Sequence, residues 1–454
     1  MSAQKYEIDM SKGSIFKNIV RFVFPLILTN VLQLLYNAAD LIVVSRWAGK
    51  EAMASVGATG SLNNLIINVF MGLSLGASVV VSRRYGARDA EGIHKSVHTS
   101  LFVGIIAGIA AASAGLVFSK PLLELMGTPE GHVLDGASLY MRIIYIGMPA
   151  SLIYNFGAAI MRAVGDTKRP LYILTATGLV NVGLNLIFVI GFDMGVAGVA
   201  IATAAANYLS MFAVMYSLIR SDSTYRLELK KLRIYKDELV DLIKVGLPAG
   251  IQGSVFALSN VVIQSAVNSF GTDAIAGSAA GANIEGFVYT AMNAFYQAAV
   301  TSVSQNYGAK DEGRINRTIL TSIVCVSVVG IVLGVSTVIF AHPLLSIYIT
   351  DSQGAMEFAS KRMIITGLPY FMCGIMEVLT GSLRGLGYSS ITAVNSFIGA
   401  CGFRIFWVFA VLPFNRTGEF LFLCWPLSWL VVIIMHVVCL LIVKKRAMRR
   451  MYGV

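Results

Sequence analysis

The stretch Tyr-Gly-Ala-Arg-Asp at residues 85–89 returns as Tyr-Gly-Ala-Lys-Asp at residues 307–311, an offset of 222 residues. Further matches at an offset of 222 or 223 residues are Pro121-Leu122-Leu123 with Pro343-Leu344-Leu345, Arg162 with Arg384, Gly165 with Gly387, and Pro25 with Pro248. Matches at one spacing along a whole chain indicate an internal duplication. The sequence therefore predicts two related halves.

The composition places these halves in a membrane. Hydrophobic residues make up 56% and charged residues 13% of the 454 residues, which is too apolar for a water-soluble surface. Apolar runs of about 20 residues recur, and inside lipid such runs cross as helices because every backbone amide must be satisfied internally. We therefore predict an all-α integral membrane protein with twelve transmembrane helices in two pseudo-symmetric six-helix lobes. The predicted spans run approximately over residues 22–45, 52–81, 95–117, 139–162, 171–191, 196–219, 240–268, 274–304, 316–341, 359–383, 390–412 and 420–443.

The basic residues indicate the orientation of the chain. With the N-terminus inside, 27 Lys and Arg residues lie on the cytoplasmic side and 6 on the outer side. Because positively charged loops stay in the cytoplasm, this bias places both termini there, in a multi-pass protein of the plasma (inner) membrane. The net charge of +11 follows alternate loops rather than one surface, so we expect no nucleic-acid partner.

The number of spans in each half determines how the halves are related. Six spans return the chain to the same side of the membrane, so the repeats are parallel, with an axis along the membrane normal. We predict an N-lobe over residues 1–220, a cytoplasmic linker over residues 221–237 and a C-lobe with a basic tail over residues 238–454. Two such lobes can alternate access to a substrate cavity; a static duplicated bundle is the alternative.

Span 1 carries a polar stripe that ends in a carboxylate. The stripe advances in steps of 3, 4 and 3 residues and consists of Asn30, Gln33, Asn37 and Asp40. This spacing places all four on one helical face. Acidic residues inside a membrane commonly face a wet cavity and carry ions. Desolvation would let Asp40 carry a proton, and neutral oxygen donors nearby would let it bind Na⁺; an Asp40 that only reaches lipid headgroups is the alternative.

Spans 5 and 6 of the same half supply neutral oxygen donors. Asn181 and Asn185 lie one turn apart on span 5, and Thr203 lies on span 6. Together with Asp40 they could form a small oxygen cage. The alternative is that these side chains only join the helices by hydrogen bonds.

The second half has its own acidic residues. Glu285 begins a stripe on span 8 that continues with Tyr289, Asn293 and Tyr296, and Glu377 lies on span 10. Two carboxylates in one lobe favour a cationic ligand. Arg404 on span 11 provides a competing explanation, because a buried arginine needs a partner and either glutamate could be it.

Together, these features resemble the multidrug and toxic compound extrusion (MATE) family, and in particular its DinF-like bacterial branch, over nearly the whole chain. The most specific matches are Asp40 in the Tyr-Asn-Ala-Ala-Asp stretch at residues 36–40, the turn Arg-Ala-Val-Gly-Asp-Thr-Lys-Arg-Pro at residues 162–170, and the repeated stretch. The turn looks like the family's RGxGDxKxP pattern, with Ala163 in place of glycine. The resemblance implies a secondary-active antiporter that exports cationic and amphipathic compounds in exchange for H⁺ or Na⁺.

The resemblance also implies which residues couple transport to the ion. In DinF-like members the cation site of the N-lobe uses the span 1 Asp, an Asn and an acidic residue one turn apart on span 5, and a span 6 Thr. Asp40, Asn181 and Thr203 match this pattern and would be the ligands of a Na⁺ ion. Asn185 replaces the acidic residue, which leaves Asp40 as the only carboxylate and favours H⁺. We expect no cofactor besides the coupling ion.

The substrate is expected to be a small cationic or amphipathic molecule. The residues expected to contact it are Asn37, Gln33, Glu285, Tyr289, Asn293 and Glu377. A flippase for a lipid-linked precursor is the alternative, since such proteins share the two-lobe plan and have a more cationic cavity, to which Arg142 and Arg404 would contribute. A membrane enzyme would need a cluster of His, Asp or Cys at one face, and none is visible. We expect a monomer in the lipid bilayer without enzymatic activity.

Overall fold

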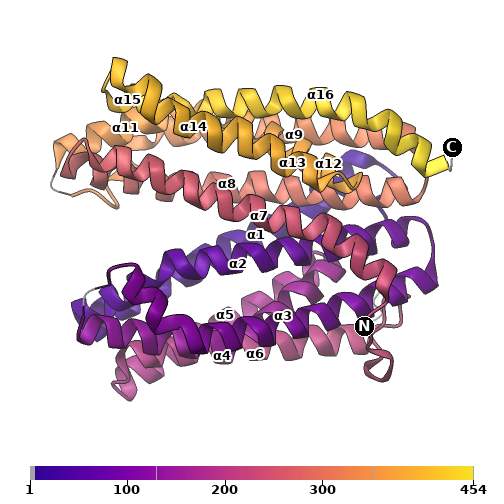
Figure 1. Ribbon diagram of the computed structural model, residues 1–454, viewed down its shortest axis with the longest axis horizontal. Helices are drawn as coiled ribbons and strands as arrows, with labels where there is room; N and C mark the ends of the chain where they lie inside the picture. The colour runs from indigo at the N-terminus through magenta and orange to yellow at the C-terminus, as the bar shows by residue number, and fades with distance from the viewer. Residues whose placement is uncertain (1–5, 129, 351, 453–454) are drawn as a thin grey trace. The chain divides into compact units, whose positions relative to one another are not determined.

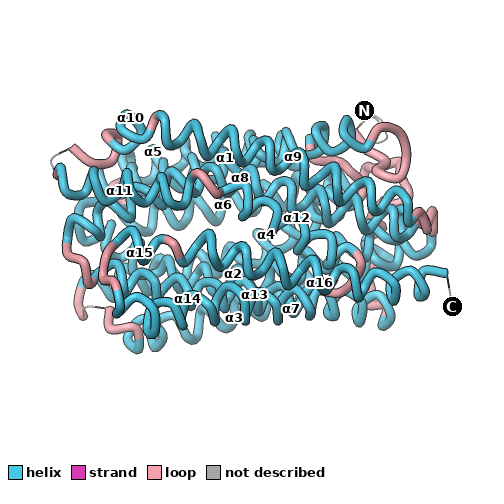
Figure 2. Tube along the Cα trace, turned by 90° about the horizontal axis from the view of Figure 1, so that it is seen from above, coloured by secondary structure: helices cyan, strands magenta, loops and turns pink. Residues whose placement is uncertain are grey.

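Helices make up all the regular structure in residues 6–128, 130–350 and 352–452, which the computed structural model describes. Figure 2 shows these helices joined by short loops. Among the described residues, ten segments are long and apolar enough to cross a membrane, and the pair Gln353–Gly367 and Tyr370–Gly385, bent by 47°, would make an eleventh span. The prediction of an all-helical membrane protein is therefore confirmed.

Two compact units make up the chain: unit 1 is Met1–Ile8 with Leu28–Leu247, and unit 2 is Asp9–Ile27 with Pro248–Val454. The division between the two units falls inside the helices α1 (Ile15–Val43) and α7 (Lys236–Asn268). Pro25 and Pro248 lie in these helices close to the division. A proline inside a helix removes one backbone hydrogen bond and favours a kink, so each of these helices is locally weakened where the units divide.

The other helices follow the predicted spans closely. Unit 1 continues with α2 (Gly49–Gly86), α3 (Ala90–Leu125), α4 (His132–Ala163), α5 (Lys168–Leu186), α6 (Gly195–Ile219) and the 3-10 turn Leu229–Lys231. Unit 2 continues with α8 (Thr272–Gly308), α9 (Glu312–Ile339), α10 (Ala341–Leu345), α11 (Gln353–Gly367), α12 (Tyr370–Gly385), α13 (Ser389–Ser396), α14 (Phe403–Phe406), the 3-10 turn Leu412–Phe414, α15 (Gly418–Phe422) and α16 (Cys424–Tyr452). Short π-helical turns occupy Val44–Ala48, Ile187–Gly191, Phe397–Gly402 and Trp407–Val411.

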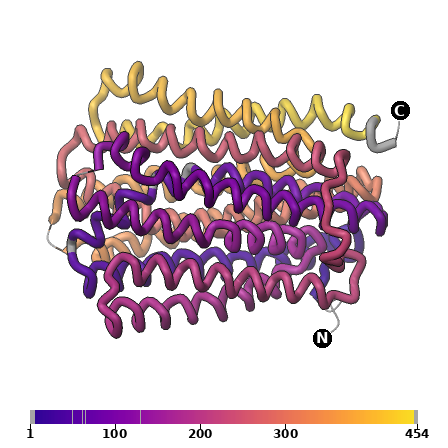
Figure 3. Tube along the Cα trace, turned by 60° about the horizontal axis from the view of Figure 1, so that its bottom comes forward, coloured from indigo at the N-terminus to yellow at the C-terminus, as the bar shows by residue number. Residues whose placement is uncertain are grey.

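Helix α4 lies in the core of unit 1, where it packs against α2, α3 and α6. Figure 1 shows α3, α4 and α6 running side by side, and Figure 3 traces them in purple and magenta. Small residues permit this packing: a Cβ atom on Gly115 of α3 would lie 2.0 Å from the ring of Tyr145 on α4. Small residues at helix contacts let membrane helices approach closely, which is how such bundles gain packing energy in lipid.

In unit 2, helix α8 corresponds to the predicted span 274–304, although it is not among the ten apolar segments. It packs against α9, α11 and α12. Its polar side chains, which lower its hydropathy, include the buried Ser278, Gln305 and Asn306. A helix with polar residues turned toward its neighbours needs less apolar surface than one that faces lipid on all sides.

The repeated stretch forms the same turn in both units. Arg88 and Lys310 both adopt a left-handed backbone with φ of 59°. The next residue caps the following helix in each case: Asp89 accepts a hydrogen bond from the backbone N–H of Gly92, and Asp311 accepts one from that of Arg314. An aspartate at this position satisfies a helix N–H that has no partner within the helix. The duplication seen in the sequence is thus also present in the backbone.

The turn between α4 and α5 depends on a glycine that packs against the N-terminal segment and on a buried aspartate. Gly165 has φ of +87°, and a Cβ atom there would lie 2.2 Å from the carbonyl oxygen of Ile8. Glycine is therefore required both by the backbone conformation and by the close approach. The buried Asp166 accepts hydrogen bonds from the backbone N–H groups of Lys168 and Arg169 and from the Arg169 guanidinium. Burial raises the pKa of the Asp166 carboxyl, while Arg169 acts in the opposite direction.

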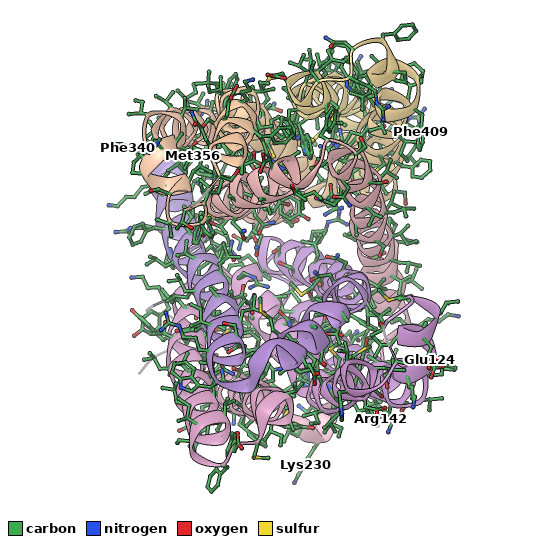
Figure 4. All side chains as sticks on the ribbon, turned by 90° about the vertical axis from the view of Figure 1, so that its left-hand side faces the viewer. Glu124, Arg142, Lys230, Phe340, Met356 and Phe409 are labelled. Atoms are coloured by element: carbon green, nitrogen blue, oxygen red, sulfur yellow. The ribbon has the colours of Figure 1, made fainter. Side chains whose placement is uncertain are left out.

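The surface of the helices is apolar over much of its extent. Phe409 is 70% and Phe340 57% exposed, and Figure 4 labels both on the outside of unit 2. Large exposed apolar side chains are unfavourable in water over a broad area. This surface therefore suits contact with lipid chains.

Candidate functional site

The four polar residues predicted to surround an ion in the first half meet in unit 1. The side-chain N–H of Asn185 donates a hydrogen bond to Asp40 Oδ1 at 2.5 Å. Asn185 Nδ2 also lies 3.4 Å from Asn181 Oδ1, and Asn181 Nδ2 lies 3.4 Å from Thr203 Oγ1. These contacts join α1, α5 and α6 through one chain of polar side chains, which we call the Asp40 cluster.

The helices place these side chains for a simple reason. Asn181 and Asn185 are four residues apart on α5, so both face α1 and α6. Asn181 is 5% exposed and Asn185 is fully buried, and Thr203 lies close enough to hydrogen-bond Asp40. The π-helical turns Val44–Ala48 and Ile187–Gly191 follow directly after the two helix segments that carry Asp40 and Asn185. Such turns occur often at functional sites, where they shift the direction of side chains.

One atom of the Asp40 cluster lacks a partner. The Oδ1 atom of Asn185 is buried and accepts no hydrogen bond from the described residues. A buried carbonyl oxygen without a donor is unfavourable. Beside a carboxylate, such an oxygen is suited to receive a cation, a water molecule or a proton donor.

Tyr140 is a member of this site that the sequence did not predict. It lies on α4, close enough to Asp40 for an electrostatic interaction between the two side chains. By contrast, Gln33 and Asn37, which were predicted to contact substrate, are exposed on α1 and do not join the hydrogen bonds of the cluster. No sequence pattern singled out Tyr140, because a tyrosine at the end of an apolar span is common at a membrane interface.

Glu285 in unit 2 forms a buried ion pair with a residue that the sequence did not indicate. Its carboxylate accepts hydrogen bonds from Arg362 Nε at 3.0 Å and Arg362 Nη2 at 2.7 Å, and from Thr366 Oγ1 at 2.6 Å. Arg362 was counted among the six basic residues of the outer side, yet it is 6% exposed. Arg404, which the sequence left open as a partner of Glu285, is therefore not the residue that Glu285 contacts. Counting Arg362 with the charges of the outer side hid this pair.

The rest of the predicted stripe on α8 contacts several different partners. Tyr289 Oη donates to Glu377 Oε1 at 3.3 Å, and Asn293 Oδ1 accepts from Gln297 Nε2 at 2.9 Å. Glu377 also does not pair with Arg404. The two glutamates thus have different environments: Glu285 is neutralised by Arg362, whereas Glu377 is held by a neutral tyrosine.

The duplicated bundle of membrane helices, with a half-buried carboxylate and amide donors among its spans, is the architecture of a polytopic membrane transporter. The chain belongs to the MatE family, whose model matches residues 25–187 and 248–409. These two matched segments lie one in each half, in agreement with the repeat.

Individual relatives extend over most of the chain. It is similar to the probable multidrug resistance protein YoeA of Bacillus subtilis, with 27% identity over 83% of this chain and 82% of that protein. It is also similar to the probable multidrug resistance protein NorM of Thermotoga maritima, with 24% identity over 88% of this chain and 87% of that protein. A solved outward-facing structure of a multidrug resistance MATE family transporter matches 100% of both chains with a TM-score of 0.88 and 22% identity.

The sequence left open a flippase, to whose cationic cavity Arg142 would contribute. Arg142, one of the two arginines that supported a cationic cavity, is exposed on α4, and Figure 4 labels it at the outer surface of unit 1. Arg142 therefore lies apart from the buried polar side chains of the Asp40 cluster.

Proposed function

We propose that this chain is a secondary-active antiporter that exports cationic or amphipathic compounds in exchange for a cation, by alternating access of its two halves. The multidrug resistance relatives support the class of substrate. The observation that supports ion coupling most strongly is the Asp40 cluster, in which a carboxylate accepts a hydrogen bond from the buried Asn185 amide inside the spans of unit 1. Acidic residues in such surroundings commonly bind the driving ion of a transporter.

Asp40 is the coupling residue in this proposal. Its carboxylate can be compensated in two ways: by a proton, which neutralises it, or by a cation held with the free Oδ1 of Asn185. Asn181 and Thr203 would complete the oxygen ligands of Na⁺. A Na⁺ ion bound by protein oxygens is favoured by more than one negative ligand, and Asp40 is the only acid in the cluster, so the proton is the favoured coupling ion.

Substrate contacts are proposed in both units. Gln33 and Asn37 present polar groups on the exposed face of α1, on the N-terminal side of Asp40 along the helix. In unit 2, Glu377 with Tyr289 and Asn293 offers a carboxylate that no arginine neutralises at close range. Glu285 is less suited to a cationic substrate, because Arg362 already occupies both of its oxygens.

The proposed setting is the plasma (inner) membrane with both termini in the cytoplasm. The basis is the excess of Lys and Arg in alternate loops. We propose a monomer, because each half already supplies six spans and the family resemblance covers a single chain.

Transport in liposomes tests this function. The purified chain is reconstituted, and the movement of an ethidium-like dye is followed under a pH-only gradient or a Na⁺-only gradient. We expect the pH gradient to drive transport in the wild type and Asp40→Asn to abolish it. The matched control is Asp135→Asn, which alters an exposed aspartate on α4 that faces Lys120 and should leave transport unchanged.

Two results would contradict the proposal. Transport that proceeds equally without any gradient would rule out antiport. Unchanged gradient-driven transport in Asp40→Asn, at wild-type levels of folded protein, would exclude Asp40 as the coupling residue. Transport driven by Na⁺ alone would retain antiport and assign Na⁺ to the Asp40 cluster instead of the proton.

A further inference from the structure

Unit 2 buries three arginines within its membrane helices. Arg362, Arg384 and Arg404 are 6%, 7% and 4% exposed. An arginine keeps its charge in a protein, and removing that charge from water is costly unless hydrogen bonds and an opposite charge compensate it. The hydrogen-bond and ion-pair partners of each arginine therefore show whether its buried charge is compensated.

Arg362 and Arg384 have partners for every guanidinium nitrogen. Arg362 donates to both oxygens of Glu285 and to Ser278. Arg384 donates from Nε to Thr392, from Nη1 to Tyr296 and from Nη2 to Gln252. Arg384 also interacts electrostatically with Glu377.

Arg404 is different, because only one of its three nitrogens has a hydrogen-bond partner. Nε donates to Ser428 Oγ at 3.0 Å, and the guanidinium lies 5.5 Å from the centre of the Trp425 ring. In the described part of the chain, Nη1 and Nη2 make no hydrogen bond, and no carboxylate oxygen lies within 4.0 Å of the side chain. No carboxylate of the described residues therefore balances the positive charge of Arg404 at close range, and its neutral contacts are Ser428 and the Trp425 ring.

The internal repeat shows that this part of unit 2 corresponds to the Asp40 cluster. At the offset of 222 residues, Tyr140, Asn181, Asn185 and Thr203 correspond to Arg362, Phe403, Trp407 and Trp425. The surrounding apolar residues obey the same offset: Ala52 with Ala274, and Val199 with Leu421, are buried in matching clusters. The corresponding positions of unit 2 therefore hold Arg362 and aromatic rings where unit 1 has the tyrosine, amide and hydroxyl side chains around Asp40.

The backbone around Arg404 is also unusual. Helix α14, which carries Arg404, has four residues and lies between the π-helical turns Phe397–Gly402 and Trp407–Val411. Helices with such turns carry functional residues more often than regular helices do. The same indole of Trp425 also contacts Arg362, at 5.2 Å from its guanidinium to the ring centre.

We propose that Arg404, which is held by Ser428 Oγ and lies beside Trp425, forms an oxyanion-binding site in unit 2, which takes the carboxylate or phosphate group of an amphipathic molecule. The planar guanidinium offers two parallel N–H groups that match the two oxygens of such a group. The Trp425 ring beside the guanidinium stabilises its charge by a cation–π contact. Only the delivery of an exported compound to this site rests on the proposed export function; binding itself does not.

Equilibrium binding without any gradient tests the site separately from antiport. The full chain in neutral detergent is titrated against two rhodamine dyes, one with a free carboxylate and the other its methyl ester, and binding is followed by fluorescence polarisation. We expect the wild type to bind the free acid more tightly than the ester. Arg404→Gln should weaken binding of the acid at least about tenfold, which corresponds to about 1.4 kcal/mol, and change binding of the ester by less than about twofold. Arg142→Gln, at an exposed arginine, should change neither.

Further arms identify the source of the oxyanion and protect against misfolding. Phosphatidylglycerol is added to the micelles as a competitor. If it displaces the free-acid dye, the site also binds lipid phosphate; if it does not, the site binds carboxylates of soluble compounds. Both outcomes support the site. Arg404→Lys keeps the charge and should retain part of the preference for the acid. The proposal is overturned if the wild type does not distinguish the two dyes, or if folded Arg404→Gln or Arg404→Lys protein distinguishes them as the wild type does.

Discussion

Removing the charge of Glu285 should destabilise unit 2 strongly, because Arg362 would remain buried without a counter-charge. Glu285→Gln preserves the shape of the side chain but replaces two charge-assisted hydrogen bonds from Arg362, at 3.0 and 2.7 Å, with weaker contacts. Arg362 cannot lose its proton, so its positive charge would remain without a counter-charge at any pH at which the protein is studied.

The expected cost follows from the burial of both partners. The side chains of Arg362 and Glu285 are 7% and 14% exposed, so solvent screens the pair little. Removing one partner of a buried ion pair costs about 3–5 kcal/mol. The double variant Glu285→Gln with Arg362→Met should recover most of the loss, since it leaves no buried charge.

The free energy of unfolding, measured by titrating the purified protein with SDS and following its helical content, tests this reasoning. Lys361→Met is a matched control: Lys361 is adjacent to Arg362 but 45% exposed, with Glu357 and Glu419 as partners. Exposed ion pairs contribute at most about 1 kcal/mol. A Glu285→Gln variant that is no less stable than Lys361→Met, or a double variant as unstable as the single one, would refute the buried-pair argument.

Two further predictions concern unit 1. Gly165→Ala should lower the free energy of unfolding by about 2 kcal/mol or more, because a side chain is unfavourable at φ of +87° and would overlap the backbone of Ile8. SDS titration measures this loss. Unchanged stability would show that the segment around Ile8 can move away from the new side chain at little cost in free energy. Asn185→Asp should place a second carboxylate beside Asp40 and give transport that a Na⁺-only gradient can drive. Dye movement in liposomes measures this gain, and a variant that still responds only to a pH gradient would contradict the assignment of Asn185 to the ion site.

Much of the Asp40 cluster could be predicted because its geometry depends mainly on helical spacing. Asn181 and Asn185 are one turn apart, and a polar stripe ending in Asp40 stands out in an apolar span, so their sharing of a face follows from the sequence. The contribution of Tyr140 could not be predicted in this way. It depends on which side of α4 faces α1, and that is decided by packing between helices far apart in the chain.

The sequence alone determined that this chain is a duplicated bundle of membrane helices, because bilayer thickness and backbone hydrogen bonding leave few other solutions for such an apolar chain. Only the tertiary structure decided the partners of the buried charges. A sequence shows that Glu285, Glu377 and Arg404 need compensation, but not which of them meet, since that depends on the rotation and register of α8, α11 and α12. For this reason Arg362, which the sequence counted with the charges of the outer side, became the partner of Glu285, and Arg404 was left without a carboxylate partner among the described residues.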